Sequence, residues 1–384
     1  MKTFCDHYND GKCRSCDLIE LSHADQILKK EKILKRALRF FPDIKLEPSV
    51  TGKLTGFRNK AKMAVTGSSR DSVIGITGSS TLDEGQALLD CAVHHPRLNL
   101  VLARMPDYIR TYDLIPYRIA EKVGELKSLI LFYSEESDEM YLRFVLRSKE
   151  CVSRIKKLLP GLQKEFPFIT CVSANLQPIP HAILEGPEEI YITEQASIRH
   201  LLDKLELTLL PKAFVQTNTE ISTKLYLTAA QWASELKPKI FMELFAGQGA
   251  FSFFAAGSSA QLIGVEINPD AVQTANETAA RLGFSQVSFV AADAGQVQSL
   301  VSHHSPDLLL VNPPRKGLGP NGVQLILQTR PPAVIYSSCS VESLAQDLQL
   351  LAAEYNISKA QIFDLFPNTS HFETLVLISR RDLT

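Results

Sequence analysis

The sequence of 384 residues has no long apolar run. Residues 1–10 are polar and charged, unlike a signal peptide, and no later stretch approaches the roughly 20 apolar residues of a membrane span. An excess of charge is also missing, because 41 Lys and Arg residues stand against 42 Asp and Glu residues. We therefore expect a cytoplasmic globular protein of two or three folded units, with no membrane association and no obligate protein partner.

A net charge of −1 does not decide whether nucleic acid is a partner, because phosphate binding depends on local basic residues. Such residues gather early in the chain, at Lys29, Lys30, Lys32, Lys35, Arg36 and Arg39, and again at Arg58, Lys60 and Lys62. Apolar residues at helical spacing lie opposite the first group. A solvated helix face is therefore as good an interpretation of it as a nucleic-acid contact.

Structural disulfides are not expected of the seven cysteines in a cytoplasmic protein. Cys5, Cys13 and Cys16 lie in a short polar segment that cannot fill a core but can wrap a metal centre. Cys91 is the best candidate for a fourth ligand, and four thiolates suit either zinc or a four-iron cluster. The spacing C-x7-C-x2-C differs from C-x3-C-x2-C, the signature of radical enzymes that use S-adenosylmethionine.

The region 51–205 has a mixed pattern that predicts an α+β domain with substrate contacts. Strands are expected at 128–134, 140–146, 171–176 and 189–193, with a helix at 152–159. The first two strands are separated by a short acidic stretch and should form a hairpin. Cys151 and Cys171 lie among apolar residues and are expected to be small buried side chains.

The region 206–384 alternates strands with helices, as in a doubly wound, mostly parallel sheet. Its first strand, 239–245, runs into Gly247 and Gly249, which permit a tight turn and the close approach of a nucleoside. Ser252 stands where dinucleotide-binding proteins have a third glycine. This difference disfavours a dinucleotide as the ligand.

Acidic residues follow the next two strands. Glu266 ends the strand 261–267, where a carboxylate can accept both hydroxyls of a ribose. Asp270 could cap the helix that runs to residue 282, which Gly283 would then end. Asp293 follows the strand 287–292 and could bond an adenine amine. Each acid alone is more often a cap or a solvated residue, but together the three strand ends predict a site for a nucleoside methyl donor.

Asn312 follows the strand 307–311, and the two prolines after it fix the backbone so that its amide is presented rigidly beside the donor methyl. Enzymes that methylate exocyclic amines of nucleic acids have a similar Asn-Pro-Pro element. The element therefore leaves the target atom open.

Cys339 follows the strand 333–338 and favours carbon 5 of a uracil as the target. An amine has its own lone pair, whereas carbon 5 becomes nucleophilic only after a thiolate adds to carbon 6. A base must then remove the carbon 5 proton, and Glu373, near the start of the last strand, is the candidate. Each residue alone could equally be a buried strand cysteine or a surface acid.

The chain as a whole resembles the RNA uracil-C5 methyltransferase family. The resemblance rests on the four cysteines 5, 13, 16 and 91 and on the segments 56–60, 214–218, 244–247, 312–315, 338–339 and 371–373. It implies that Cys339 is the nucleophile and Glu373 the base. It also implies that the donor or the target base is contacted by Gln216, Phe245, Glu266 and Asn312.

The fold that this resemblance implies is a Rossmann-like class I methyltransferase domain at 206–384, preceded by an α+β RNA-binding domain at 51–205. The RNA-binding domain would overlap an N-terminal iron-sulfur region at 1–95. By resemblance, not by spacing, the cysteines would hold a [4Fe-4S] cluster that shapes the RNA-binding region. The transfer-RNA branch of the family lacks these cysteines.

Because Cys5 leaves no room for an N-terminal β-barrel, the chain looks like the short ribosomal form, which acts on uridine 747 of 23S ribosomal RNA. Asn312 departs from the Asp of many relatives, and Ser340-Val341 from their Asn-Pro. A loop uridine is the expected target, because unstacking costs least there. The alternatives are another ribosomal uridine such as 1939, an exocyclic-amine methyltransferase with a structural Cys339, or a non-catalytic RNA-binding protein.

Overall fold

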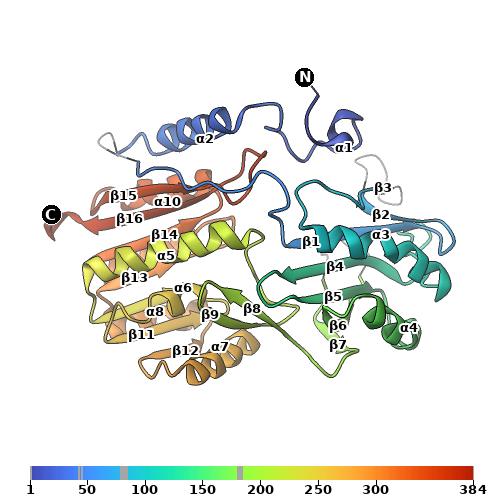
Figure 1. The fold of residues 1–384 in the computed structure, drawn as a ribbon. Helices are drawn as coiled ribbons and strands as arrows, with labels where there is room; N and C mark the ends of the chain where they lie inside the picture. The colour runs from blue at the N-terminus through green and yellow to red at the C-terminus, as the bar shows by residue number, and fades with distance from the viewer. Residues whose placement is uncertain (1, 42–43, 45, 78–84, 180–184, 384) are drawn as a thin grey trace. The chain divides into compact units, whose positions relative to one another are not determined.

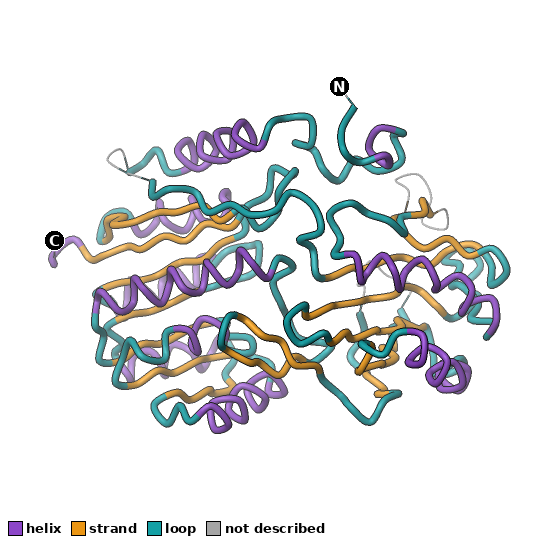
Figure 2. The backbone as a smooth tube through the Cα atoms, in the orientation of Figure 1, coloured by secondary structure: helices purple, strands orange, loops and turns teal. Residues whose placement is uncertain are grey.

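The computed structural model describes residues 2–41, 44, 46–77, 85–179 and 185–383, and the chain forms two compact units (Figures 1 and 2). Unit 1 comprises Met1–Cys16 and Leu54–Lys212, and unit 2 comprises Asp17–Lys53 and Ala213–Thr384. The segment Asp17–Lys53 thus packs with the C-terminal half of the chain. Within the described ranges, no helix is long and apolar enough to cross a membrane.

Unit 1 is built on a seven-stranded sheet in the order β3-β2-β1-β4-β5-β6-β7. The strands are β1 Lys60–Gly67, β2 Ser72–Thr77, β3 Gly85–Ala87, β4 Leu126–Ser134, β5 Glu139–Leu146, β6 Ile169–Leu176 and β7 Glu188–Tyr191. Neighbours are antiparallel except β5 and β6, which helix α4 (Val152–Glu165) connects. The predicted hairpin of β4 and β5 is confirmed, as are the other predicted strands and the helix of this region.

The two faces of this sheet are covered differently. Helices α3 (Pro96–Thr111) and α4 pack their apolar residues against one face, and Leu98, Met105 and Ile155 are fully buried there. The hairpin of β8 (Ile198–Leu202) and β9 (Leu205–Leu209) packs on β4 and β5. Cys151 and Cys171 are buried, as predicted. A short helix, α1 (Asp6–Asn9), lies in the N-terminal segment.

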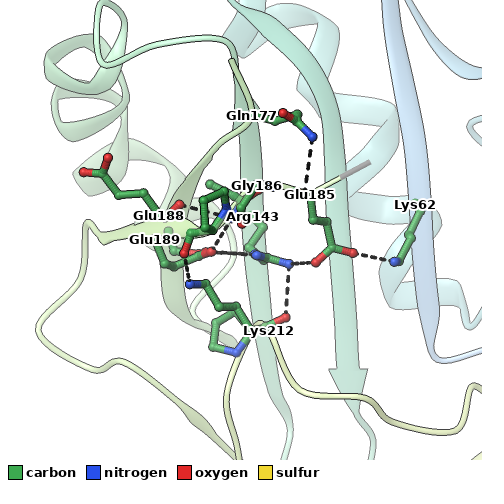
Figure 3. Close-up of polar contacts among 12 residues, drawn as sticks. Lys62, Arg143, Gln177, Glu185, Gly186, Glu188, Glu189 and Lys212 are labelled. Carbon is green, nitrogen blue, oxygen red and sulfur yellow. Dashed lines mark hydrogen bonds and ion pairs between the residues drawn. The ribbon is translucent and has the colours of Figure 1, made fainter. Parts of the chain in front are cut away.

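An ion-pair network surrounds the buried Arg143 of β5 (Figure 3). The Arg143 guanidinium, 1% exposed, bonds the carboxylate of Glu189 at 2.8 and 2.6 Å and also contacts Glu185. Glu185 accepts in turn from Lys62 Nζ at 2.6 Å. Burial without such partners would leave a costly isolated charge, so the two glutamates are what make a buried arginine tolerable here.

Unit 2 contains a second seven-stranded sheet, in the order β12-β11-β10-β13-β14-β16-β15. The strands are β10 Ile240–Leu244, β11 Gln261–Glu266, β12 Val287–Ala291, β13 Leu308–Val311, β14 Ala333–Ser338, β15 Tyr355–Phe363 and β16 Glu373–Arg380. The first five strands in that order run parallel to one another. Strand β16 is antiparallel to β14, and β15 is antiparallel to β16. The predicted doubly wound, mostly parallel sheet is therefore confirmed.

Helices lie in two layers on this sheet (Figure 1). One layer is formed by α2 (His23–Ala37), α8 (Ala294–His304), α9 (Gly319–Thr329) and α10 (Val341–Leu351), which share a core with alternate strand residues such as Met242 and Tyr336. The other is formed by α5 (Thr219–Leu236), α6 (Ala250–Phe254) and α7 (Pro269–Leu282). Parallel strands covered on both faces leave only their carboxyl ends accessible for polar chemistry.

The start of α7 corrects one prediction from the sequence. Asn268, not Asp270, caps the helix, and its Oδ1 accepts from Asp270 N at 3.0 Å and Ala271 N at 3.4 Å. Pro269 occupies the first helical position, where its fixed φ is favourable, so the cap is the residue before it, two residues earlier than predicted. Gly283 ends the helix at φ 74°, as predicted.

Candidate active site

The loop after β10 is a tight turn of left-handed residues. Phe245, Gly247 and Gly249 have φ angles of 62°, 55° and 82°. A Cβ on Gly249 would lie 2.4 Å from the ring of Phe289, so only glycine fits. Phe245 adopts this conformation despite a cost of roughly 1–2 kcal/mol, and the residue is 43% exposed. Strain of this kind is typical of binding sites, where it holds a side chain ready for a ligand.

Glu266 holds that turn from the next strand. Its Oε2 accepts from Gly247 N at 2.9 Å, and its Oε1 accepts from Ile267 N at 2.9 Å and Asn268 N at 3.0 Å. The carboxylate remains partly exposed at the carboxyl end of β11. The structure thus brings together two residues that the sequence analysis assigned to the same donor site.

Asp293 lies at the same edge, beyond β12, and is exposed. Its Oδ1 accepts from Gln296 N at 3.1 Å, while Gln296 Oε1 accepts from Asp293 N at 3.1 Å. This reciprocal pair is a capping box at the start of α8. Asp293 therefore has a structural role, and its contact with adenine stays a prediction.

Two amide side chains face no described partner. Gln216 is buried in the segment before α5, and Asn312 is partly buried after β13; neither side chain hydrogen-bonds to any residue that the structure describes. Asn218 fixes the first of these segments, because its Oδ1 caps α5 at Ile221 N (3.3 Å) and its Nδ2 donates to Leu365 O (3.3 Å). Unpaired amides beside a strand edge are suited to a polar ligand.

The loop after Asn312 is held from α10. Asp347 accepts from Leu318 N at 2.7 Å, from Gly319 N at 3.2 Å and from the Tyr336 hydroxyl at 2.7 Å. Ser343 Oγ donates to Arg315 O at 3.0 Å. The sequence analysis missed these positioning residues. The available signal was an acid, Asp347, among the mainly apolar residues on the buried face of a helix.

Cys339, Ser337 and Glu373 converge where β14 meets β16. Ser337 and Cys339 are two residues apart and face the same side of the sheet. The antiparallel register pairs Ser338 with Thr374, which brings Glu373 alongside Cys339. Ser337 Oγ donates to Glu373 Oε1 at 2.6 Å, with both side chains buried, and Cys339 is partly exposed. The two residues predicted as catalytic are therefore neighbours.

The electrostatics of this group suit proton transfer. Burial raises the pKa of Glu373 to about 7, against the opposing hydrogen bond from Ser337. Burial also raises the pKa of the Cys339 thiol; the Glu373 charge adds to this, and the charge and hydrogen bond of the Arg315 guanidinium oppose it. Arg315 is thus a third polar group at the thiol, and the sequence analysis placed it in a motif but not in the site. A thiol with a nearby guanidinium and a carboxyl that titrates near neutrality can combine nucleophilic and acid-base catalysis.

A second buried acid lies on β10 and was also missed. Burial raises the pKa of Glu243 to about 8, although Ser252 donates to it from its backbone N at 2.9 Å and from its hydroxyl. Burial raises the pKa of the Tyr226 hydroxyl on α5, and the charges of Glu373 and Glu243 add to the rise. A glutamate inside an apolar strand was the signal in the sequence.

The four cysteines predicted as metal ligands lie in unit 1, are partly buried and form no disulfide. Burial raises the pKa of Cys91, and the charges of Cys5 and Cys13 contribute to the rise. The Cys91 loop is paired with the segment before β1, where Arg58 N donates to Val93 O at 2.8 Å. Across the described ranges, no group of three or more His, Cys, Asp or Glu residues is placed to hold a metal ion.

Comparison with known proteins links this geometry to a family. The model of the family described as tRNA (Uracil-5-)-methyltransferase matches residues 188–381. A 23S rRNA (uracil(747)-C(5))-methyltransferase RlmC from Shewanella sp. (strain W3-18-1) is 39% identical over 97% of this chain and 96% of its own. The protein of the same name from Shewanella amazonensis is 40% identical over 97% of both chains.

A solved structure shows the same fold. It is the Pyrococcus abyssi tRNA (uracil-54, C5)-methyltransferase in complex with S-adenosyl-L-homocysteine. The TM-score is 0.78 and the identity 24%, over 95% of this chain and 85% of that one.

Proposed function

Because the chain belongs to the RNA uracil-C5 methyltransferase family, we propose that it methylates carbon 5 of uridine 747 in 23S ribosomal RNA, with S-adenosylmethionine as donor. The observation that carries the proposal is the convergence of Cys339, Ser337 and Glu373 at one strand end. Relatives named 23S rRNA (uracil(747)-C(5))-methyltransferase match almost the full chain, which favours uridine 747 over other ribosomal uridines. An enzyme with a ribosomal RNA substrate is proposed to act in the cytoplasm.

The Cys339 thiolate adds to carbon 6 of the uracil, and the ring becomes an enolate whose carbon 5 is nucleophilic. S-adenosylmethionine, when bound, supplies an electrophilic methyl group to carbon 5. Glu373 then accepts the carbon 5 proton, the double bond re-forms and the thiolate leaves carbon 6. Arg315 favours the thiolate at both the start and the end of this cycle.

For the donor we propose the carboxyl edge of the unit 2 sheet. Glu266 would bind the ribose hydroxyls, and Gly247 and Gly249 give the backbone room for the nucleoside. Asp293 would contact the adenine amine while capping α8. The remaining proposed contacts, to the donor or the target base, come from the exposed ring of Phe245 and the unpaired amides of Gln216 and Asn312.

For unit 1 we propose an RNA-binding role with a [4Fe-4S] cluster held by Cys5, Cys13, Cys16 and Cys91. None of the four cysteines is in a disulfide, and four thiolates are the ligand set of this cluster. The Arg58 guanidinium lies near Cys91 and Cys16, where it would offset thiolate charge. Protein purified without oxygen should contain iron and sulfide and absorb visible light; stoichiometric zinc would contradict the cluster.

The mechanism is tested by removing the nucleophile. Cys339→Ala should abolish methylation of a 23S transcript that contains uridine 747, and wild-type protein should form a denaturation-resistant adduct with the 5-fluorouridine form of that transcript. Cys171→Ala is the matched control, since it also removes a thiol but leaves methylation intact. Near-normal activity of Cys339→Ala would rule out the covalent route. Mapping 5-methyluridine in 23S RNA from a deletion strain would separate uridine 747 from uridine 1939.

A further inference from the structure

Helix α2 of unit 2 carries a basic face that no part of the proposed mechanism uses. The helix buries Gln26, Lys30 and Leu34 on one side. Its other side exposes five cations, which we call the basic face: Lys29, Lys32, Lys35, Arg36 and, just beyond the helix end, Arg39. Residues 29, 32, 36 and 39 recur at helical spacing, so their side chains form a stripe roughly 15 Å long.

No acid among the described residues neutralises the charge on this face. None of its five cations forms an ion pair with any residue in the described ranges. The acids of the same helix are engaged elsewhere, because Glu31 accepts from Ser49 Oγ at 2.8 Å and Asp25 pairs with Ser22 Oγ at 2.6 Å. In a chain with a net charge of −1, such a concentration of unpaired cations is a local electrostatic feature.

Lys30, which points the other way, shows how the helix is fixed. Its Nζ donates to Asp364 Oδ1 at 2.6 Å and to Phe366 O at 3.3 Å, with both charged side chains fully buried. His23 Nε2 lies 3.1 Å from Asp364 Oδ2. The helix is therefore held on the residues that follow β15.

More bonds extend this anchor toward the active site. Asn368 N donates to Gln26 Oε1 at 2.9 Å, and Ser370 N donates to Asp17 Oδ1 at 2.9 Å. The segment 364–372 runs directly into Glu373, the proposed base. The helix that carries the basic face is therefore hydrogen-bonded to the loop that leads into the active site.

We propose that the basic face of α2 binds the phosphate backbone of the RNA substrate and guides the strand that carries the target uridine to Cys339 and Glu373. This inference rests on the proposed function for the identity of the RNA. A rigid row of unpaired cations is suited to a polyanion, since each phosphate contact releases condensed counterions. Because the row lies outside the catalytic group, it should affect RNA binding and not the chemical steps.

The test compares two double substitutions in unit 2. Lys29→Gln/Lys32→Gln removes two charges from the basic face and keeps helix propensity. Lys237→Gln/Lys239→Gln is the matched control, because both lysines are exposed and lie before β10, at the opposite edge of the sheet from the site. Affinity for the transcript that contains uridine 747, KM and kcat are measured for each from 50 to 200 mM salt.

For the first variant we expect KM and Kd for the transcript to rise about fivefold to tenfold, with kcat unchanged. The slope of log affinity against log salt should become shallower by about 1.4–1.8, because each of the two lost phosphate contacts contributes about 0.7–0.9, and the control should match wild type. Wild-type affinity and salt slope in the Lys29→Gln/Lys32→Gln variant would overturn the inference, and so would equal losses of affinity in both variants. The first result is also the one expected if the basic face binds an acidic protein and not RNA.

The outcomes separate this inference from the proposed function. If the wild-type protein does not methylate the transcript, the proposed function fails, while the binding measurements still test the basic face. If methylation proceeds but both double variants bind alike, the inference about α2 fails alone. Arg36→Gln/Arg39→Gln provides an independent second variant with the same expected direction.

Discussion

Two pairs of glutamates, one pair in each unit, are held in opposite ways. In unit 1, Glu185 and Glu189 surround the guanidinium of Arg143 (Figure 3). In unit 2, Glu373 and Glu243 receive hydrogen bonds from serines, Ser337 and Ser252, and no described cation pairs with either.

The partner decides what each carboxyl can do. Burial raises the pKa of Glu185, but the hydrogen bond from Lys62 and the charge of Arg143 outweigh it, so the net shift is downward. Glu373 and Glu243 instead have pKa values raised to about 7 and about 8. A cation fixes a permanent charge that holds structure, whereas a hydroxyl leaves a carboxyl able to exchange a proton near neutral pH.

The largest expected effect comes from removing the exchangeable group. Glu373→Gln should lower methylation about 10²–10⁴-fold, because an amide cannot accept the carbon 5 proton. The covalent adduct with natural RNA should accumulate and be visible as a shifted band on denaturing gels. Normal turnover, or an inactive variant without any adduct, would show that Glu373 is not the base.

Breaking the network of unit 1 should cost stability instead. Arg143→Met leaves the buried Glu189 without its cation and Glu185 with Lys62 alone, and the free energy of unfolding should fall by about 3–5 kcal/mol. Urea unfolding and hydrogen exchange at β5 would measure this. Arg104→Met, which removes an exposed ion pair with Glu165, is the control and should have a far smaller effect. Equal losses of unfolding free energy in the two variants would show that burial does not determine how much each ion pair contributes to stability.

Glu243 should make the stability of unit 2 depend on pH. Its folded-state pKa of about 8 lies above the ordinary value of 4.5, so the folded protein holds a proton that the unfolded chain has released. Stability is therefore full at low pH and falls as pH rises from about 4.5 to 8. Glu243→Gln should remove this fall and gain, relative to wild type, up to a few kcal/mol at pH 8. If the free energies of unfolding of wild type and Glu243→Gln differ by the same amount at pH 5, 7 and 8, the raised pKa of Glu243 is contradicted.

The smallest expected effect tests the serine itself. Loss of the Ser337 hydrogen bond should raise the pKa of Glu373, so the acid limb of the pH–rate profile in Ser337→Ala should move up by about one unit. The rate at pH 7 should fall several-fold and recover at higher pH, and Ser337→Thr should behave as wild type. Ser222→Ala, which removes a buried hydroxyl whose one described partner is Thr219 O, is the control. An unchanged acid limb would limit Ser337 to a packing role.

Local signals were enough to predict the strands and the residues at their ends. Apolar runs identified β10, β11, β13 and β14, and the glycines, Glu266, Asn312 and Cys339 followed directly from where those runs stop. The prediction that Asp270 caps the helix was wrong because polar residues lie on both sides of Pro269. The helix begins at the proline, so the residue before it, Asn268, is the cap. The segment Asp17–Lys53 gave no sign that it packs with unit 2, since its partner loop lies more than 300 residues away.

The sequence by itself determined the order of strands and helices, the residue types at each strand end and, through Cys339 with Glu373, the class of reaction. These properties are local, because periodicity and turn residues act over a few positions. Only the tertiary structure decided that Ser337 donates to Glu373, that Arg315 reaches Cys339 and that Lys30 is buried while its neighbours face solvent. Such pairings depend on sheet register and on which face of a helix is covered, and those are set by the packing of distant segments.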